Sequence, residues 1–300
     1  MGPGPQEPRE GLASHPAFEP FLAWYFVLVW GSGFLATKAG LQHAAPFTFL
    51  ALRFTLGLAI LVPLVAWMRP PWPSGAAQWG HLVVAGLLMH AVNLGGSHYA
   101  QYLGMSAGVA ALLLGTQPLA TALVSSRLLG ERLRPRQWLG VAVGLAGVAL
   151  VVWHKIDVRA ITGASLAAVA IALAGVTAGT LYQRAFSPRA DLRSAALIQF
   201  AATLAVVAPL AWGVEDFRFA WSWTLVLCIA FLVIFASILA VSALHVLMRR
   251  GHATRVTSLL YLTPVVAVAL EAALFGVVPS PLTAAGVAVT CVGVALVTRS

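Results

Sequence analysis

The sequence is poor in charge and in cysteine. Only 9% of its 300 residues are charged, whereas a typical soluble domain carries about 25%. With 60% hydrophobic residues and a mean hydropathy of +0.89, much of the chain cannot face water. The two cysteines, Cys228 and Cys291, lie inside apolar runs, so they form neither a disulfide framework nor a metal motif. We therefore predict an integral membrane protein.

Signals for catalysis and targeting are also missing. The chain has no HExxH or GxSxG motif and no paired carboxylates within its apolar runs, so we expect no enzyme, no cofactor and no metal site. The first twenty residues lack a basic segment leading into an apolar core, so we expect no cleaved signal peptide. The net charge of +9 does not indicate nucleic-acid binding, because excess Lys and Arg in a membrane chain usually marks cytoplasmic loops.

The sequence does contain ten apolar stretches of about the length that crosses a bilayer core. They lack the alternation of membrane-barrel strands, so we predict an all-α fold with ten transmembrane helices. Eight of the ten tryptophans lie at the ends of these stretches, as expected for an interfacial aromatic belt. The predicted spans are 21–41, 47–67, 81–102, 107–129, 138–153, 164–184, 194–212, 221–247, 256–278 and 282–298.

The second half of the chain repeats the first at a constant offset of 146 residues. Between 107–151 and 253–297, 16 of 45 positions are identical without a gap, and Pro118 maps onto Pro264. Five helices per copy is an odd number, so the second copy enters the membrane inverted, which is typical of transporters. A scaffold, a receptor or a membrane enzyme is the alternative. The predicted units are a tail at 1–20, a first five-helix repeat at 21–153, a linker at 154–163 and a second repeat at 164–298.

Loop charge predicts the orientation of the chain. With a cytoplasmic N-terminus, the inner segments carry thirteen arginines and the outer loops carry only Lys155, Arg159 and Arg218. Because Lys and Arg accumulate on the cytoplasmic side, we predict that both termini are cytoplasmic and that the linker at 154–163 is periplasmic.

Several short motifs lie along the apolar stretches. They are Trp30-Gly31-Ser32-Gly33-Phe34 with Lys38, Pro46 with Arg53-Phe54, Thr116-Gln117-Pro118, Leu129-Gly130-Glu131-Arg132-Leu133 and Leu262-Thr263-Pro264. Together they resemble the motifs of the EamA-like branch of the drug/metabolite transporter superfamily. The resemblance covers about 21–298 and implies ten helices, a bacterial inner membrane and similarity to exporters of aromatic amino acids. Val277 stands where Glu131 would recur in the second copy, which departs from the family pattern.

The third apolar stretch carries polar groups that a lipid-facing helix would avoid. The equivalent positions of the second half are apolar, and recognition of one asymmetric small molecule would require such an asymmetry. Alternatively, these groups only join neighbouring helices by hydrogen bonds. The spacing places His90, Asn93, Ser97 and Gln101 on one helical stripe, with His98 and Tyr102 beside it. The other predicted substrate-lining residues are Trp30, Gln117, Tyr182, Gln199, Ser258 and Tyr261.

Few charged residues lie within the apolar runs. The predicted topology places Lys38, Arg53 and Glu271 in the outer third of the membrane, where an unpaired buried charge is expensive. Glu271 should therefore pair with Lys38 or Arg53, either for structure or for proton or substrate coupling.

At the inner side, Arg184 is the counterpart of Lys38 at the 146-residue offset, and Glu131 is its nearest candidate partner. Pro118 and Pro264 each free a backbone carbonyl at mid-depth, so each can be a hinge or a static kink.

These observations predict an exporter of small metabolites, favouring aromatic or neutral amino acids, that works by alternating access down the substrate gradient. The alternative is a proton-coupled multidrug or purine/nucleoside exporter. The expected partners are a small-molecule substrate and the lipid bilayer, with no nucleic acid. The sequence does not set the oligomeric state, and a monomer is compatible with it.

The orientation can be tested with a topology reporter fused after Ser300. We expect a reporter that works only in the periplasm to be inactive there, and one that works only in the cytoplasm to be active, because the charge bias places the C-terminus inside. Periplasmic activity at this position would contradict the predicted topology.

Overall fold

The computed structural model describes residues 18–128, 133–157, 161–240, 243 and 262–298. All the regular secondary structure in the described chain is helical, apart from one isolated antiparallel bridge between Ala44 and Phe219. The helices are α1 (Phe18–Gly40), α2 (Pro46–Met68), α3 (Ala76–Gly86), η2 (Leu87–Val92), α4 (Asn93–Tyr102), α5 (Ala107–Leu114), α6 (Gln117–Leu128), α7 (Pro135–Asp157), α8 (Gly163–Phe186), α9 (Leu192–Glu215), α10 (Trp223–Ala230), η3 (Phe231–Ala240), α13 (Thr263–Phe275) and α14 (Pro281–Thr298).

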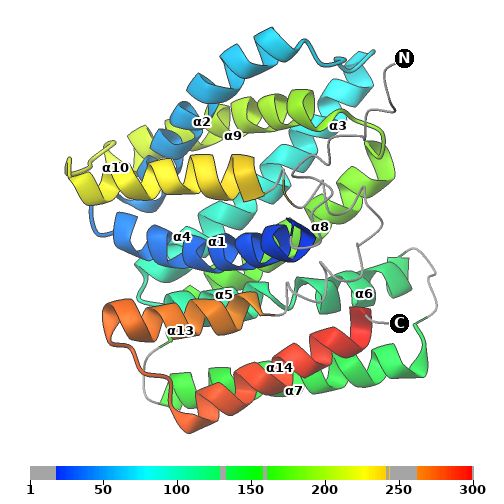
Figure 1. Ribbon diagram of the computed structural model, residues 1–300, viewed down its shortest axis with the longest axis vertical. Coiled ribbons are helices and arrows are strands. Elements are labelled where there is room, and N and C mark those ends of the chain that lie inside the picture. The colour runs from blue at the N-terminus through cyan, green and yellow to red at the C-terminus, as the bar shows by residue number, and fades with distance from the viewer. Residues whose placement is uncertain (1–17, 129–132, 158–160, 241–242, 244–261, 299–300) are drawn as a thin grey trace, which may run out of the picture.

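Each of the ten predicted spans corresponds to helix in the described chain. Seven helical stretches are long and apolar enough to cross a membrane, and α13 and α14 are shorter apolar helices. In Figure 1 the first described helix, α1, begins and the last, α14, ends at the same right-hand end of the bundle. An even number of crossings produces this arrangement, as ten spans require.

Several spans depart from the predicted α-helices in continuity or in length, among them the eighth, in which the π-helical η3 follows α10. The third span begins earlier, at Ala76, and contains the π-helical turn η2 between α3 and α4. The fourth is interrupted between α5 and α6, next to Pro118, which cannot donate the backbone hydrogen bond of a continuous helix. The fifth is longer than 138–153, because Pro135 starts α7 and the helix continues to Asp157.

Two pairs of helices that correspond at the 146-residue offset pack against each other. The most extensive interhelical packing joins α7 to α14, and the next joins α2 to α9. Phe54 of α2 and Phe200 of α9, which correspond at this offset, meet edge to face with centroids 4.9 Å apart. Such contacts between counterparts are expected along the pseudo-two-fold axis of an inverted repeat.

Small residues let α7 and α14 approach closely and show that they are antiparallel. A Cβ at Gly140 would lie 2.7 Å from the carbonyl oxygen of Gly293, and one at Gly147 would lie 2.7 Å from that of Gly286. Residue numbers therefore increase along α7 while those of the facing residues on α14 decrease, so the two helices are antiparallel. Close backbone approach at small residues is a main source of helix association in membranes.

The surface of the bundle is apolar, as contact with lipid requires. Trp67, Trp153, Trp221 and Trp223 are each at least 74% exposed, and all lie at or near helix ends. This distribution agrees with the predicted aromatic belt.

The α7–α14 contact predicts a matched pair of glycine variants. In Gly293→Ala the new methyl group would clash with the backbone nitrogen of Gly144, so we expect a loss of about 1–3 kcal/mol in the free energy of unfolding. In Gly80→Ala, on an open face of α3, the new methyl group meets nothing within 4 Å. Thermal unfolding in detergent should show a lower Tm for Gly293→Ala only. Equal Tm values would contradict the close contact.

Candidate functional site

A buried carboxylate joins three helices at one end of the bundle. Glu271 of α13 is 3% exposed, and its Oε1 lies 2.7 Å from Nζ of Lys38 on α1. The backbone nitrogens of Ala107 and Gly108, at the start of α5, donate to the same carboxylate at 2.9 and 2.8 Å. We call Glu271, Lys38 and these two N–H groups the Glu271 clasp. Charge-assisted bonds to a helix N-terminus satisfy a carboxylate that burial would otherwise destabilise.

The side chains around the clasp fit its geometry. Nζ of Lys38 also lies 4.8 Å from the centroid of the Phe275 ring, which adds a cation–π contact. Gly108 is needed at the start of α5, because a Cβ there would lie 3.0 Å from Oε2 of Glu271 and 2.6 Å from Val268. The clasp therefore ties α1 and α5 of the first half to α13 of the second.

The charged residues singled out in the sequence lie in different parts of the structure. Glu271 pairs with Lys38, as predicted, and not with Arg53. Arg53 donates from Nη2 to Oγ of Ser237 at 3.1 Å, and Ser237 in turn donates to the carbonyl of Leu232 at 2.9 Å. Arg53 thus links α2 to the π-helical η3. Glu131 lies outside the described residues.

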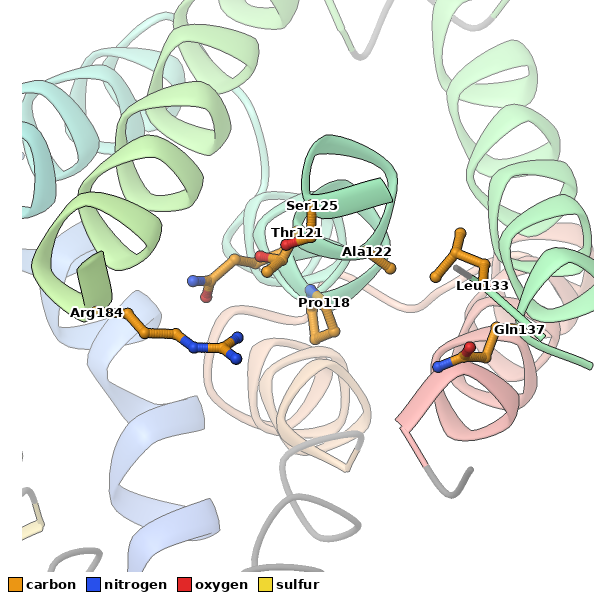
Figure 2. A pocket seen from close by; sticks show the side chains of 8 residues that line it. Pro118, Thr121, Ala122, Ser125, Leu133, Gln137 and Arg184 are labelled. Carbon is orange, nitrogen blue, oxygen red and sulfur yellow. The ribbon is translucent and has the colours of Figure 1, made fainter. Parts of the chain in front are cut away.

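A pocket lies at the other end of the bundle, where Arg184 is found. It has a volume of about 310 Å³. Ser125, which lines this pocket, lies 18 residues beyond Ala107 of the Glu271 clasp. That separation corresponds to roughly 27 Å along a helix, so the pocket and the clasp lie at opposite ends of the bundle. Figure 2 shows Arg184 reaching from α8 towards Pro118 and Thr121 of α6, with Leu133 and Gln137 on the opposite side. The lining residues are Gln117, Pro118, Thr121, Ala122, Ser125, Leu133, Gln137 and Arg184. We call this cavity the Arg184 pocket.

Two glutamines that line this pocket have defined partners. Gln117, predicted to line the substrate site, donates to Oγ1 of Thr180 at 3.0 Å and thereby joins α6 to α8. Gln137 donates to the carbonyl of Val297 at 3.3 Å and accepts from the backbone nitrogen of Arg134 at 2.8 Å. Two of the predicted site residues therefore lie together here, Gln117 and Arg184, along with the predicted hinge Pro118.

The third span does not form the single stripe that its spacing predicted. His90 lies within η2, where a π-turn accommodates more residues than the 3.6 assumed. Its ring lies edge to face with Phe54 and Phe200, and Nε2 is 3.4 Å from Oε1 of Gln199. His90 therefore packs between α2 and α9.

The rest of that span is largely buried, except at its end. Asn93 donates to the carbonyl of Met89 within its own helix, at 3.1 Å. Ser97 and His98 are 3% and 2% exposed, whereas Tyr102 is 54% exposed at the end of α4. The side chains of His98 and Gln101 retain buried polar atoms without a hydrogen-bond partner in the described part of the chain.

The remaining predicted residues lie in different places. Gln199 donates to Oε1 of Gln183 at 3.1 Å, and the hydroxyl of Tyr182 lies 2.8 Å from Nδ1 of His81. Trp30 is 40% exposed and stacks on Phe26. Ser258 and Tyr261 lie outside the described residues. The structure therefore does not bring all the predicted substrate-lining residues into one cavity.

The sequence analysis missed Glu215, the last residue of α9. Its carboxylate accepts from the backbone nitrogens of Phe47 and Thr48 at 3.0 and 2.7 Å, and from the hydroxyls of Thr48 and Tyr99. An acid at the start of another helix satisfies its unpaired N–H groups. Its position at the end of an apolar run gave no signal, because the partners lie far away in the sequence.

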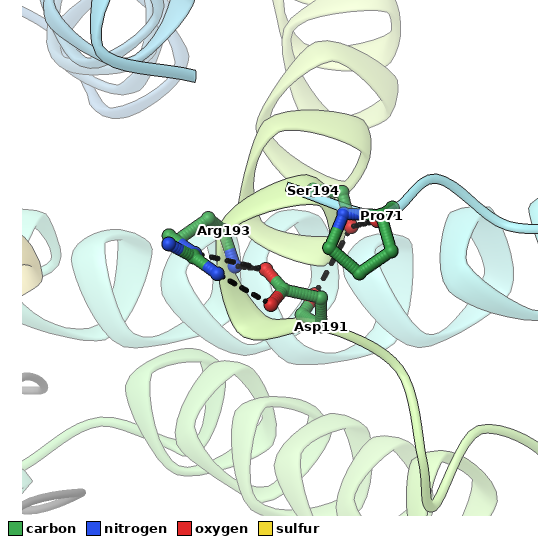
Figure 3. A network of polar contacts seen from close by, with 4 residues as sticks. All are labelled: Pro71, Asp191, Arg193 and Ser194. Carbon is green, nitrogen blue, oxygen red and sulfur yellow. Dashed lines mark hydrogen bonds and ion pairs between the residues drawn. The ribbon is translucent and has the colours of Figure 1, made fainter. Parts of the chain in front are cut away.

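A second contact between helix ends was also missed, at the start of α9. Asp191 caps the helix by accepting from the backbone nitrogen of Arg193 at 2.9 Å, and Ser194 donates to the carbonyl of Pro71 at 2.9 Å (Figure 3). The Arg193 guanidinium holds the pKa of Asp191 below its usual value. The Asp-Leu-Arg-Ser sequence before an apolar run is a helix-start signal that could have identified this cap.

Comparison with known proteins places this architecture in a family. The model of the EamA-like transporter family matches residues 18–153 and again 159–299. The uncharacterized inner membrane transporter YedA of Escherichia coli K12 is 27% identical over 263 residues, covering 87% of this chain and 83% of the relative. A Salmonella typhimurium protein described as a "probable amino-acid metabolite efflux pump" is 26% identical over 267 residues, covering 85% of this chain and 86% of that protein.

A solved structure shares the fold. It is described only as the crystal structure of a protein and has a TM-score of 0.65 at 23% identity, covering 95% of this chain and 98% of that one. The family model accounts for both halves of the chain, and the relatives span nearly its whole length. This chain is a membrane protein of the EamA-like transporter family.

Proposed function

We propose that this protein exports small metabolites, with aromatic and neutral amino acids as the favoured substrates, by alternating access. The name of the Salmonella relative supports amino-acid-related substrates. The observation that carries the mechanism is the difference between the two ends of the bundle. Lys38 is held in the Glu271 clasp at one end, whereas Arg184 lines a pocket at the other. Alternating access requires that one end of the bundle is closed while the other is open.

The charge bias of the loops supports the direction of export. It assigns the Glu271 end to the periplasm and the Arg184 end to the cytoplasm. In this orientation both termini are cytoplasmic in the bacterial inner membrane, and the Arg184 pocket receives the substrate from inside. The clasp then prevents leakage through the periplasmic end until the substrate is bound.

We also propose that the substrate gradient, rather than protons, drives the transport. Glu271 already accepts from an ammonium and two backbone N–H groups, so its described contacts serve to hold α1 and α5 against α13. His90 is held between aromatic rings of α2 and α9 and does not line the Arg184 pocket.

The function is tested by counterflow in proteoliposomes. We expect liposomes loaded with an unlabelled amino acid to take up the same labelled compound, because exchange needs only the two access states. An imposed pH gradient should leave the initial rate unchanged within about twofold. Empty liposomes are the control. No exchange with any aromatic or neutral amino acid would contradict the proposal, and uphill uptake driven by the pH gradient alone would favour the proton-coupled alternative.

The gating role of the clasp is tested by alkylation of a buried cysteine. Ala111, 2% exposed, packs against Leu35 and Ala267 beneath the clasp. In an Ala111→Cys protein that lacks Cys228 and Cys291, Glu271→Gln should raise the rate of maleimide labelling at least about tenfold, because a buried ion pair that loses one charge is strongly destabilised.

Glu215→Gln is the matched control for the clasp. It removes a carboxylate of a neighbouring helix end that contacts none of α1, α5 or α13 in its described hydrogen bonds. When Glu215→Gln is combined with Ala111→Cys, the rate of maleimide labelling should stay close to that of the Ala111→Cys protein with Glu215 intact. Equal acceleration by both variants would indicate general loosening of the bundle, and no acceleration by Glu271→Gln would exclude a gate at the clasp.

A further inference from the structure

One cation within the apolar runs is left without an acidic partner. Lys38 and Arg53 lie in these runs together with a single acid, Glu271, and Glu271 pairs with Lys38. In the described part of the chain Arg53 forms no ion pair, and its one hydrogen bond goes to Oγ of Ser237 at 3.1 Å. The segment 241–261, which follows η3, contains no acidic residue. A positive charge inside an apolar bundle is costly unless an anion pairs with it.

Arg53 points to the interior of the bundle and not to lipid. Thr55 and Val62, which are exposed, lie about 200° and 180° from it around α2. Arg53 lies instead on the side of α2 that meets η3, where it contacts Ser237. It is seven residues from Pro46, the first residue of α2, which corresponds to roughly 10 Å along the helix. Its side chain is only partly buried, so a ligand can reach it from inside the bundle.

Two histidines lie beside Arg53, and neither supplies a negative charge. Phe49, one turn earlier on α2, meets the ring of His98 with centroids 5.5 Å apart, and Phe54 meets the ring of His90 with centroids 5.8 Å apart. The charge of Arg53 acts on both imidazole rings. His98 is 2% exposed, and its Nδ1 has no hydrogen-bond partner in the described part of the chain. A buried polar nitrogen without a partner is costly unless a ligand or water satisfies it.

The two π-helical segments of the described chain both lie beside Arg53. Ser237, which contacts Arg53, belongs to η3, and His90 belongs to η2. At the 146-residue offset η2 corresponds to 233–238, within η3, so each half of the chain places a π-turn at the same position. π-turns are rare and occur frequently at functional sites. This second observation, independent of the missing acid, indicates that the surroundings of Arg53 serve more than packing.

We propose that Arg53 binds the carboxylate group of the exported amino acid inside the bundle, with Nδ1 of His98 as a second donor. A guanidinium binds a carboxylate through charge-assisted hydrogen bonds, which can be bidentate. His98 can donate from Nδ1 when that nitrogen carries the proton. This inference rests on the proposed export function and names the group by which the substrate is recognised. The substrate then supplies to Arg53 the anion that Glu271 supplies to Lys38.

The inference predicts how the purified full-length protein responds to paired probes. At saturating concentration L-phenylalanine and L-leucine should raise its Tm by at least about 2 °C, because a ligand of the native state stabilises it. L-phenylalaninamide and L-leucinamide, which lack the carboxylate, should not. Arg53→Gln should lose the response to both acids. Ser237→Ala is the matched control: it removes the described partner of Arg53 but keeps the cation, so it should keep the response.

A second pair of variants needs no ligand and keeps Arg53. Ser237→Asp places a carboxylate next to the guanidinium, because Oγ of Ser237 already lies 3.1 Å from Nη2 of Arg53, and Ser237→Asn has the same shape without the charge. The Tm of Ser237→Asp should exceed that of Ser237→Asn by about 2–4 °C. Ser237→Asp should also no longer respond to the acids, because its own carboxylate occupies the site.

Several results would overturn the carboxylate site. They are equal responses to acids and amides, no response to either acid, a response to sodium chloride as large as that to the acids, retention of the acid response in Arg53→Gln, and its loss in Ser237→Ala. A Tm of Ser237→Asp no higher than that of Ser237→Asn would overturn it as well. If Arg53→Gln does not fold, the Ser237 variants still decide the question.

Failure of this site is distinguishable from failure of transport. Counterflow of the amides at the same rate as the acids would remove the site and leave export standing. A response to acids that depends on Arg53, without counterflow of any of them, would remove export and leave the site.

Discussion

The buried carboxylate of Glu271 is the interaction on which the closed end of this molecule depends. A charge inside an apolar bundle is tolerated only when it is paired and its lone pairs are used. Glu271 meets this condition with groups from α1 and α5, so these helices must lie against α13. The start of α5 fits there because Gly108 leaves room for the carboxylate.

The second constraint is the duplication itself. Two similar five-helix units that enter the membrane in opposite directions pack through corresponding elements, as Phe54 with Phe200 and α7 with α14 show. Symmetric packing leaves the two ends equivalent unless individual residues differ. Glu271 and Ser125, which correspond at the 146-residue offset, are such a difference: Glu271 lies in the clasp, and Ser125 lines the Arg184 pocket. The proposed mechanism exchanges the closed and the open state between the two ends of the bundle.

The sequence was sufficient for features that depend on composition and on repetition. It predicted the all-α membrane fold, ten spans and an ion pair of Glu271 with either Lys38 or Arg53, because bilayer thickness and the cost of buried charge restrict the alternatives. It did not choose between the two cations. It did not predict the orientation of His90, because the spacing argument assumed a regular α-helix and η2 is a π-turn. Nor did it predict the contact of Glu215 with the start of α2, which joins residues 167 positions apart. Such contacts depend on tertiary packing and leave no local pattern.

The central claim is that the two ends of the bundle open in alternation, and distances between spin labels test it most directly. In a protein without Cys228 and Cys291, one label pair at Tyr102 and Val278 reports on the Glu271 end, and another at Arg134 and Arg189 reports on the Arg184 end; all four side chains are exposed. Adding a transported substrate should lengthen one distance and shorten the other. Distances that stay unchanged, or that change in the same sense at both ends, would contradict alternating access.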